Sequence, residues 1–240
     1  MCDRCFFQEM IPMLYNPFAN LKKREWFLWI VSLAVVAASN IMAGKADPVT
    51  LSATLIGVTA LIFVARGDVW GQILTVVFSI LYGITSYSFS YYGEMLTYLG
   101  MTAPIAVFSI ATWLKNPYEK GKNEVRISRL DGKRKAIMLL SCTVVTAASY
   151  FLLKALETPN LFISTVSVVT SFLASFLMMY RNSWYAVAYA ANDVVLIILW
   201  VLASMEDRAY IPMIACFGMF LANDLYGFVS WKKREKVQKL

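Results

Sequence analysis

The side chains best able to do chemistry are concentrated in residues 183–193, where an amide, a carboxyl and three aromatic rings interrupt a segment otherwise apolar enough to cross a membrane. A polar group without a partner in hydrocarbon costs on the order of several kcal/mol. An intramembrane Asn192 or Asp193 is therefore a candidate for a binding pocket, a transport pathway or a contact between helices.

Two other apolar segments carry polar side chains. In residues 69–90 these side chains follow steps of three and four, which places them on one helix face. In residues 209–231 they gather toward the C-terminal end. We predict binding roles for Gln72, Ser79, Tyr82, Trp184, Tyr185, Tyr189, Asn192, Asn223 and Tyr226. Thr75 and Ser86 share the first face, and we interpret them mainly as helix-packing residues.

The predicted binding faces combine amides, hydroxyls and aromatic rings with almost no formal charge. They suit a flat, hydroxylated ligand that is neutral or singly cationic, because a delocalised cation over an aromatic ring gains roughly 0.5–2 kcal/mol. Phosphate would need arginine, and none is expected at depth. Asp193 and Asp224 leave three interpretations open: carboxyls satisfied by neighbouring helices, a proton-coupling pair, or the catalytic pair of a membrane-embedded enzyme.

Several classes of site are excluded by composition. The chain has no histidine, which removes histidine-ligated metals, histidine-held haem and Ser-His nucleophile pairs. Cys2 and Cys5 form a C-x-x-C without a second pair, so we expect no four-ligand zinc site. Cys142 and Cys216 lie in apolar runs and should pack as small hydrophobes. We expect no cofactor, no resident metal and no catalytic residue.

The elements that position these residues are membrane helices. Of the 240 residues, 59% are hydrophobic and 15% charged, against roughly a quarter charged in soluble domains. The first 25 residues show no cleavable signal pattern. At about 20 residues per crossing, the sequence predicts an all-α membrane protein with eight spans. The spans fall at residues 26–43, 49–65, 69–90, 93–115, 136–156, 159–180, 183–204 and 209–231.

The basic residues predict the orientation of the spans, because cytoplasmic loops carry an excess of Lys and Arg. With both termini in the cytoplasm, 19 of the 22 basic residues lie on the cytoplasmic side. Only Lys45, Lys154 and Arg208 lie on the other side. This topology, together with anionic lipid, accounts for the net charge of +7, so no nucleic acid partner is expected.

The layout contains a candidate repeat of three helices. Its landmarks are Arg66 and Arg181, Trp70 and Trp184, and Trp113 and Trp231, at separations of 115, 114 and 118 residues. One helix crosses between the two triplets, so both start on the same face, as in transporters that hold substrate between parallel repeats. Alternatively, Trp and basic residues only mark the membrane interfaces. The predicted parts are a tail and accessory transmembrane helix (1–48), a first repeat (49–116), a basic loop and linking helix (117–158), a second repeat (159–233) and a basic tail (234–240).

Specific motifs carry a resemblance to a known family. Asn223-Asp224-Leu225-Tyr226-Gly227-Phe228-Val229-Ser230-Trp231 is similar to the N-x-x-Y-G-F-x-x-W exit of the PnuC family of bacterial nicotinamide riboside transporters. The pieces Leu81-Tyr82-Gly83 and Tyr92-Gly93-Glu94 agree with the family's first half. The family motif W-x-x-x-W-x-x-x-N ends here at Asn192, with Ala188 where the family has its second Trp.

The resemblance implies an architecture and a transport mode. The fold would be a SWEET-like bundle of three, one and three helices, preceded by one additional N-terminal helix. The protein would be a homotrimer in the bacterial inner membrane. It would carry nicotinamide riboside by facilitated diffusion, and a cytoplasmic kinase would trap the substrate by phosphorylation. A carrier of thiamine or riboflavin remains an alternative, as does a structural subunit that binds no small molecule.

The resemblance also implies a role for each candidate residue. Trp184, with Tyr185 or Tyr189, would stack the ring, although Trp184 is expected to lie nearer the cytoplasmic rim. Asn192 and Gln72 would bind the carboxamide or the ribose. Asn223 and Tyr226 would close the cytoplasmic side. Ser79 and Tyr82 would line the pocket from the other repeat.

Overall fold

The computed structural model describes residues 16–42, 48–119 and 124–238. In this part of the chain eight helices are long and apolar enough to cross a membrane, which confirms the predicted all-α class and the number of spans. The spans are α2 (Lys23–Met42), α3 (Pro48–Ala65), α4 (Val69–Ser88), a composite of α5 (Tyr92–Thr97), η3 (Tyr98–Thr102) and α6 (Ala103–Leu114), α7 (Gly132–Ala155), α8 (Leu161–Met179), α9 (Tyr185–Ser204) and α10 (Ile211–Val237). Short 3-10 helices, η2 (Pro17–Asn20) and η4 (Arg208–Tyr210), precede α2 and α10.

α7 and α10 exceed their predicted lengths by the most residues, and local polar bonds account for both. α7 begins at Gly132 because the Asp131 side chain accepts a hydrogen bond from the Arg134 backbone N–H at 2.8 Å, an N-terminal cap. α10 continues to Val237. Its last turns are fixed by Glu235, which pairs with Lys232 at 2.8 Å and accepts from Ser183 Oγ at 2.9 Å.

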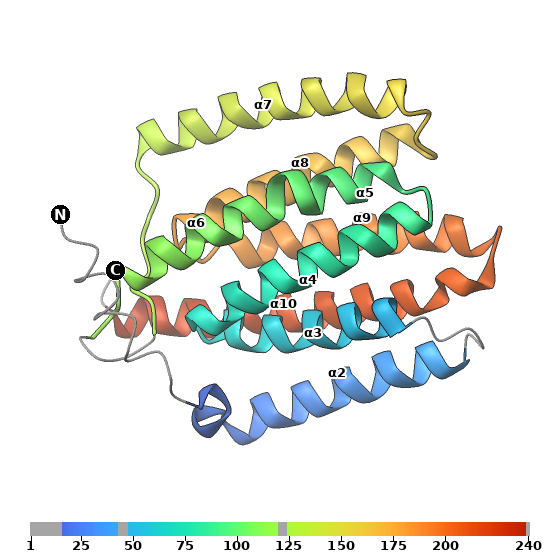
Figure 1. Ribbon diagram of the computed structural model, residues 1–240. Helices are drawn as coiled ribbons and strands as arrows, with labels where there is room; N and C mark the ends of the chain where they lie inside the picture. The colour runs from blue at the N-terminus through green and yellow to red at the C-terminus, as the bar shows by residue number, and fades with distance from the viewer. Residues whose placement is uncertain (1–15, 43–47, 120–123, 239–240) are drawn as a thin grey trace, which may run out of the picture.

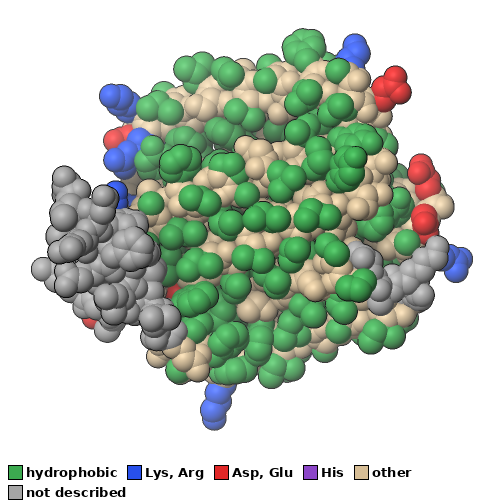
Figure 2. Space-filling model, viewed as in Figure 1, with side chains coloured by type: hydrophobic (Ala, Val, Ile, Leu, Met, Phe, Trp, Pro, Cys, Tyr) green, Lys and Arg blue, Asp and Glu red, His purple; other side chains and the backbone are tan. Residues whose placement is uncertain are grey.

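Six of the spans form a closed ring. Each consecutive pair in the order α3, α4, α6, α8, α9, α10 is in contact, and α10 returns to contact α3. The remaining two lie on opposite sides of the bundle, with α7 against α8 and α2 against α3 and α10 (Figure 1). Apolar side chains cover the flanks of the helices, and charged side chains gather at the two ends (Figure 2). The ring therefore presents an apolar flank to lipid and keeps its interior for protein contacts.

The third span of the ring is interrupted by a π-helical segment, η3, between α5 and α6. Pro104 follows this segment in the first turn of α6. Proline supplies no N–H and its ring crowds the preceding turn, and single π-turns inside α-helices are a common way to absorb such a defect. The π-turn has one residue more than an α-turn. Two of its side chains, Tyr98 and Thr102, are buried and face the ring interior.

Two tryptophans hold the triplets α3–α6 and α8–α10 together reciprocally. Trp113, in the last helix of the first triplet, donates its indole N–H to the carbonyl of Met178 in α8 at 3.3 Å. Trp231, in the last helix of the second triplet, donates to the carbonyl of Val64 in α3 at 2.9 Å. The two rings also contact each other, with centroids 5.7 Å apart. Each triplet thus ends by bonding the first helix of the other.

The turns that follow α3 and α8 have the same construction. Gly67 and Arg181 both adopt a positive φ, of 69° and 56°. Each donates its N–H to the carbonyl three residues earlier, and the next residue donates to the carbonyl five residues earlier. The side chains of Asp68 and Asn182 then accept from the N–H of Trp70 and Trp184, both at 3.0 Å. Residues 114 apart therefore play the same structural role at the starts of α4 and α9.

The cysteine predictions are confirmed where they can be examined. Cys142 and Cys216 are free and buried, and they pack in two of the apolar clusters. Cys2, Cys5 and Lys45 lie outside the described residues.

We predict that Trp231→Phe and Trp113→Phe each lower the stability of the purified protein, because each removes a buried hydrogen bond that joins the two triplets. The expected loss is about 1 kcal/mol per variant, measured as a lower midpoint of thermal unfolding in detergent. Trp184→Phe is the control, since this ring is 54% exposed and should shift the midpoint little. Equal midpoints for all three variants would contradict the proposed holding role.

Candidate ligand-binding cavity

The ring encloses a cavity to which all six of its spans contribute. The cavity measures about 50 Å³. The lining residues are Gly57, Ala60, Leu61, Val64, Gln72, Thr75, Phe78, Tyr98, Thr102, Met178, Tyr189, Asn192, Asp193, Phe220 and Asp224. Pockets that hold drug-sized molecules measure about 300–1,000 Å³. The site is therefore a contracted pocket that must widen to take a ligand.

Asn192 is the most firmly positioned polar group in the cavity wall. Its carbonyl oxygen accepts hydrogen bonds from Thr170 Oγ1 at 2.8 Å and Ser171 Oγ at 2.9 Å, both on α8. In this arrangement the oxygen faces the two hydroxyls, and the bonds hold the side chain against α8. The NH₂ group is thereby left as the donor available to a ligand.

Gln72 faces the same cavity from α4. The residue is 2% exposed, and its side-chain nitrogen is buried with no hydrogen-bond partner among the described residues. A buried donor without a partner costs about 1–3 kcal/mol. Gln72 and Asn192 thus offer amide groups from opposite triplets, and a ligand with carbonyl or hydroxyl oxygens would satisfy them.

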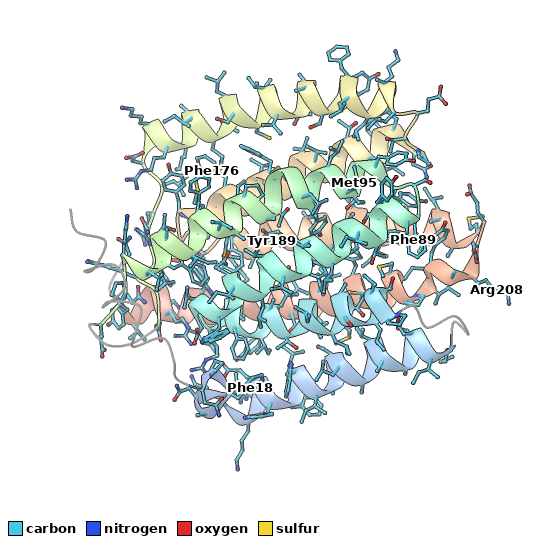
Figure 3. The ribbon with its side chains drawn as sticks, in the orientation of Figure 1. Phe18, Phe89, Met95, Phe176, Tyr189 and Arg208 are labelled. Atoms are coloured by element: carbon cyan, nitrogen blue, oxygen red, sulfur yellow. The ribbon has the colours of Figure 1, made fainter. Side chains whose placement is uncertain are left out.

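Four aromatic rings complete the apolar part of the wall: Phe78, Tyr98, Tyr189 and Phe220. Tyr189, which Figure 3 shows far from both ends of the bundle, hydrogen-bonds Ser175 through its hydroxyl at 3.0 Å. Phe220 reaches the wall because Gly57 has no side chain, since a Cβ there would lie 2.5 Å from Phe220 Cζ. The aromatic faces give a flat ligand surfaces on which to stack.

The only charged side chains among the described residues that line the cavity are Asp193 and Asp224. Both are buried, at 2% and 3% exposure, and the two carboxyls interact with each other. Asp193 Oδ2 has no hydrogen-bond partner in the described chain. Two adjacent carboxylates repel, so the pair does not carry two negative charges at once, and any charge that it carries is negative. The wall therefore favours a cation over an anion.

Aromatic clusters lie toward both ends of the ring. Toward the basic end lie Trp113, Trp231 and Tyr185. Toward the other end Tyr91 packs against Trp200, with ring centroids 4.8 Å apart. Because the cavity between them is smaller than a ligand pocket, binding requires the helices to move.

Of the nine predicted binding residues, the structure places Gln72, Tyr189 and Asn192 at the cavity. Tyr82 packs with Phe78 and accepts the indole N–H of Trp200 at 3.1 Å. Ser79 is buried, and its hydroxyl has no partner among the described residues. Both therefore lie on the predicted helix face but outside the cavity wall.

Two further predicted binding residues, Trp184 and Tyr185, lie where α9 begins, nearer the basic end of the bundle. Trp184 contacts Phe228, with ring centroids 5.5 Å apart, and the ammonium of Lys232 lies 5.1 Å from its ring. Tyr185 is fully buried against Trp231, with ring centroids 4.7 Å apart. Neither residue lines the cavity.

Asn223 and Tyr226 contact α2 instead of the cavity. Asn223 donates to Ser32 Oγ at 3.0 Å and to the Met219 carbonyl at 2.7 Å. The Tyr226 hydroxyl donates to Glu25 at 3.2 Å. The predicted closing residues thus join α10 to the helix outside the ring.

Sequence reasoning missed the polar face of α8. Ser164, Ser167, Ser171 and Ser175 are all buried, and their spacing of three, four and four places them on one helix face. Ser167 donates to Glu94 at 2.8 Å, while Ser171 and Ser175 hold the cavity residues Asn192 and Tyr189. The periodicity was a usable signal, although small hydroxyl residues are also ordinary packing residues in membrane helices.

The described residues contain no group of three or more His, Cys, Asp or Glu side chains placed to hold a metal ion. The cavity chemistry is therefore that of a binding site built from amides, hydroxyls, aromatic rings and a carboxyl pair.

Comparisons with known proteins agree on one family. A family model described as nicotinamide mononucleotide transporter matches residues 47–233. A nicotinamide riboside transporter PnuC of Neisseria mucosa is 27% identical over 232 residues, covering 89% of this chain and 86% of that protein. A second protein of that name, from Haemophilus influenzae, is 23% identical over 213 residues, covering 86% and 90%. The crystal structure of the vitamin B3 transporter PnuC superposes with a TM-score of 0.79 at 21% identity, covering 99% of this chain and 100% of that one.

We predict that replacing both hydroxyl donors to Asn192, in Thr170→Val/Ser171→Ala, destabilises the protein by about 1–3 kcal/mol, because the amide oxygen is left buried without a donor. The measurement is the thermal unfolding midpoint in detergent. Thr165→Val on the same helix is the control, since Thr165 bonds only the backbone carbonyl of Leu161. A double variant as stable as the control would show that Asn192 does not depend on these bonds.

Proposed function

The chain belongs to the nicotinamide mononucleotide transporter family, and on that premise we propose that it carries nicotinamide riboside across a bacterial inner membrane by facilitated diffusion. Both curated relatives are named nicotinamide riboside transporters. The family is one of transporters, so Asp193 and Asp224 are assigned to ligand binding and the interpretation as an enzyme is set aside. The observation that carries the proposal is the cavity inside the six-helix ring, lined by amides, aromatic rings and a carboxyl pair.

The cavity chemistry matches each part of the riboside. The nicotinamide ring is flat and, in the riboside, carries a positive charge. It would stack among Phe78, Tyr98 and Tyr189 beside the Asp193 and Asp224 carboxyls. The carboxamide and ribose hydroxyls would bond Asn192 and Gln72, whose free amide groups face the cavity from opposite sides.

The same chemistry argues against the phosphorylated form of the ligand. No Lys or Arg is among the described residues that line the cavity, and a phosphate buried without a cation or sufficient donors is strongly unfavourable. Discrimination against the mononucleotide would also explain trapping, because a cytoplasmic kinase that adds phosphate would prevent the product from leaving. Transport would then need no coupling ion.

The structure supports two parallel repeats of three helices joined by α7. The bonds of Trp113 and Trp231 are reciprocal, and the turns after α3 and α8 are built alike. Several residues that line the cavity occupy matching positions of the two triplets. At a separation of 114 these are Val64 and Met178, Thr75 and Tyr189, and Phe78 and Asn192, and at 118 they are Thr102 and Phe220. This is the arrangement expected of a SWEET-like transporter with a central site.

The charge distribution supports placing both ends of the chain in the cytoplasm. Arg66 and Arg181 lie in turns at one end of the bundle, where the 124–131 segment bonds Gly67, Arg181 and Gln238. Lys154 and Arg208 lie at the other end. A cytoplasmic basic end satisfies the positive-inside rule. A homotrimeric assembly belongs to the proposal as well.

We predict that titration of the purified protein with nicotinamide riboside gives saturable binding, and that the mononucleotide binds at least about tenfold more weakly, a difference of roughly 1.4 kcal/mol. The uncharged, reduced form of the riboside should also bind more weakly. Calorimetry measures all three affinities. Tighter binding of thiamine or riboflavin would overturn the substrate assignment, and unchanged return of the ligand distinguishes a carrier from an enzyme.

The carboxyl pair should account for the preference for the cation. In Asp193→Asn/Asp224→Asn neither side chain can carry a negative charge, so the riboside and its reduced form should bind with more similar affinities than in the unsubstituted protein. If the ratio of the affinities for the riboside and its reduced form does not change, the carboxyl pair does not recognise the cation.

We predict that Asn192→Ala weakens riboside binding about tenfold, since a lost hydrogen bond to a buried partner is worth about 1–2 kcal/mol. Asn40→Ala is the matched control. Asn40 is 2% exposed and bonds only the Val36 carbonyl in α2, so it should keep full affinity. Unchanged affinity in Asn192→Ala would exclude Asn192 from the binding site.

A further inference from the structure

A second, basic pocket lies at the end of the bundle that the proposed function places in the cytoplasm. It is formed by the start of α2, the end of α3 and the last turns of α10, and the centre of a water molecule can reach about 630 Å³ of it. Its cationic lining residues are Lys22, Lys23, Arg24, Arg66, Lys233 and Arg234. Two acids, Glu25 and Glu124, also line it, so the pocket has a large excess of positive charge.

Both acids are already engaged by the two arginines. Glu25 pairs with Arg66 at 2.7 Å and also accepts from the backbone N–H of Lys22 at 2.7 Å. Glu124 pairs with Arg234. The other four cations form no ion pair within the described chain, so their charge is available to a ligand.

The arginines keep unused donors. Arg66 uses a single nitrogen, Nη1, for its bonds to Glu25 and to the Asn20 carbonyl. Its Nε is buried without a hydrogen-bond partner among the described residues, and the same holds for the Nε of Arg234. A guanidinium presents its N–H groups as a planar fork that fits the oxygens of a phosphate. Two partly free forks beside exposed lysines are more specific than the general excess of basic residues in cytoplasmic loops.

We propose that this pocket binds a phosphate group, carried either by the headgroup of an anionic lipid or by a small soluble molecule. The proposal rests on the orientation given above, because anionic lipid and phosphorylated metabolites are both present at the cytoplasmic face. Basic pockets between helices on this face are known lipid headgroup sites. The bound phosphate would bridge α2, which lies outside the ring, to the ring helices α3 and α10. It is a different site from the cavity, which has no cationic lining residue in the described chain.

The test uses the full chain in a neutral detergent, with thermal unfolding followed against concentration of each probe. The probes are short-chain phosphatidylglycerol, short-chain phosphatidylcholine, inorganic phosphate and nicotinamide mononucleotide. Lys22→Gln/Lys23→Gln/Lys233→Gln removes three pocket charges that form no ion pair in the described chain. The control Lys115→Gln/Lys133→Gln/Lys135→Gln removes three exposed charges that flank the 116–131 connection and do not line the pocket.

Phosphatidylglycerol, but not phosphatidylcholine, should raise the unfolding midpoint of the unsubstituted protein and of the control. Each Lys near an anionic surface contributes about fivefold in affinity, so the pocket variant should bind on the order of a hundredfold more weakly. A response to phosphate or the mononucleotide and not to phosphatidylglycerol assigns the site to soluble ligands. Equal responses of the two triple variants, or no response to any probe, would overturn the proposal.

Riboside affinity is measured on the same variants. Because no substituted lysine lines the cavity, both variants should bind the riboside as the unsubstituted protein does. Failure of the phosphate site therefore leaves riboside binding intact, and failure of the proposed function would appear as absent riboside binding in all proteins alike.

Discussion

The structure depends on the rule that a polar group inside a membrane needs a partner. Most of the intramembrane hydroxyls satisfy it locally, as Thr165 does by bonding the backbone one turn earlier. The polar groups at the cavity instead bond to side chains on neighbouring helices, and some of their atoms have no partner in the part of the chain that the structure describes. Asn192 has its oxygen bonded twice, while Gln72 and Asp193 each keep a buried atom without a partner. At the cavity a ligand with both donors and acceptors would complete this pairing, which makes ligand binding and helix packing parts of one network.

The same rule explains why the triplets meet as they do. An indole N–H buried near the end of a membrane helix requires an acceptor, and a carbonyl in the last turn of a helix has a second lone pair for an additional donor. Trp113 and Trp231 each find such a carbonyl on the first helix of the other triplet. Val64 and Met178, whose carbonyls accept these bonds, also line the cavity. A motion that opens one junction therefore disturbs the wall of the site directly.

The sequence could predict the spans and the general face of each polar helix, because apolar length and helical period are local properties. It could not predict depth or neighbours. Ser79 and Tyr82 share a helix face with Gln72, yet Tyr82 packs against Trp200 and only Gln72 lines the cavity. Tyr98 and Thr102 enter the wall through a π-turn before Pro104, a distortion no periodic pattern reveals. Trp184 lies at the helix start, where 54% of it is exposed, because the turn that caps α9 fixes its position before the helix begins.

The contribution of α2, the helix outside the family match, to the packing of the ring is the least expected feature of the structure. The family model begins at residue 47, after α2, yet α2 bonds two residues of the family-like motif in α10. Asn223 reaches Ser32 and Tyr226 reaches Glu25, and Glu25 also holds Arg66 at the end of α3. One acid on α2 thus ties together the first helix of one triplet and the last helix of the other, beside the Trp231 junction. Because Asn223 keeps its side-chain oxygen buried and without a partner in the described chain, α2 satisfies only its donor. α2 therefore holds Asn223 in place, while the side-chain oxygen of Asn223 keeps no partner in the described chain. In this way α2 contributes to the geometry of the ring without lining the cavity.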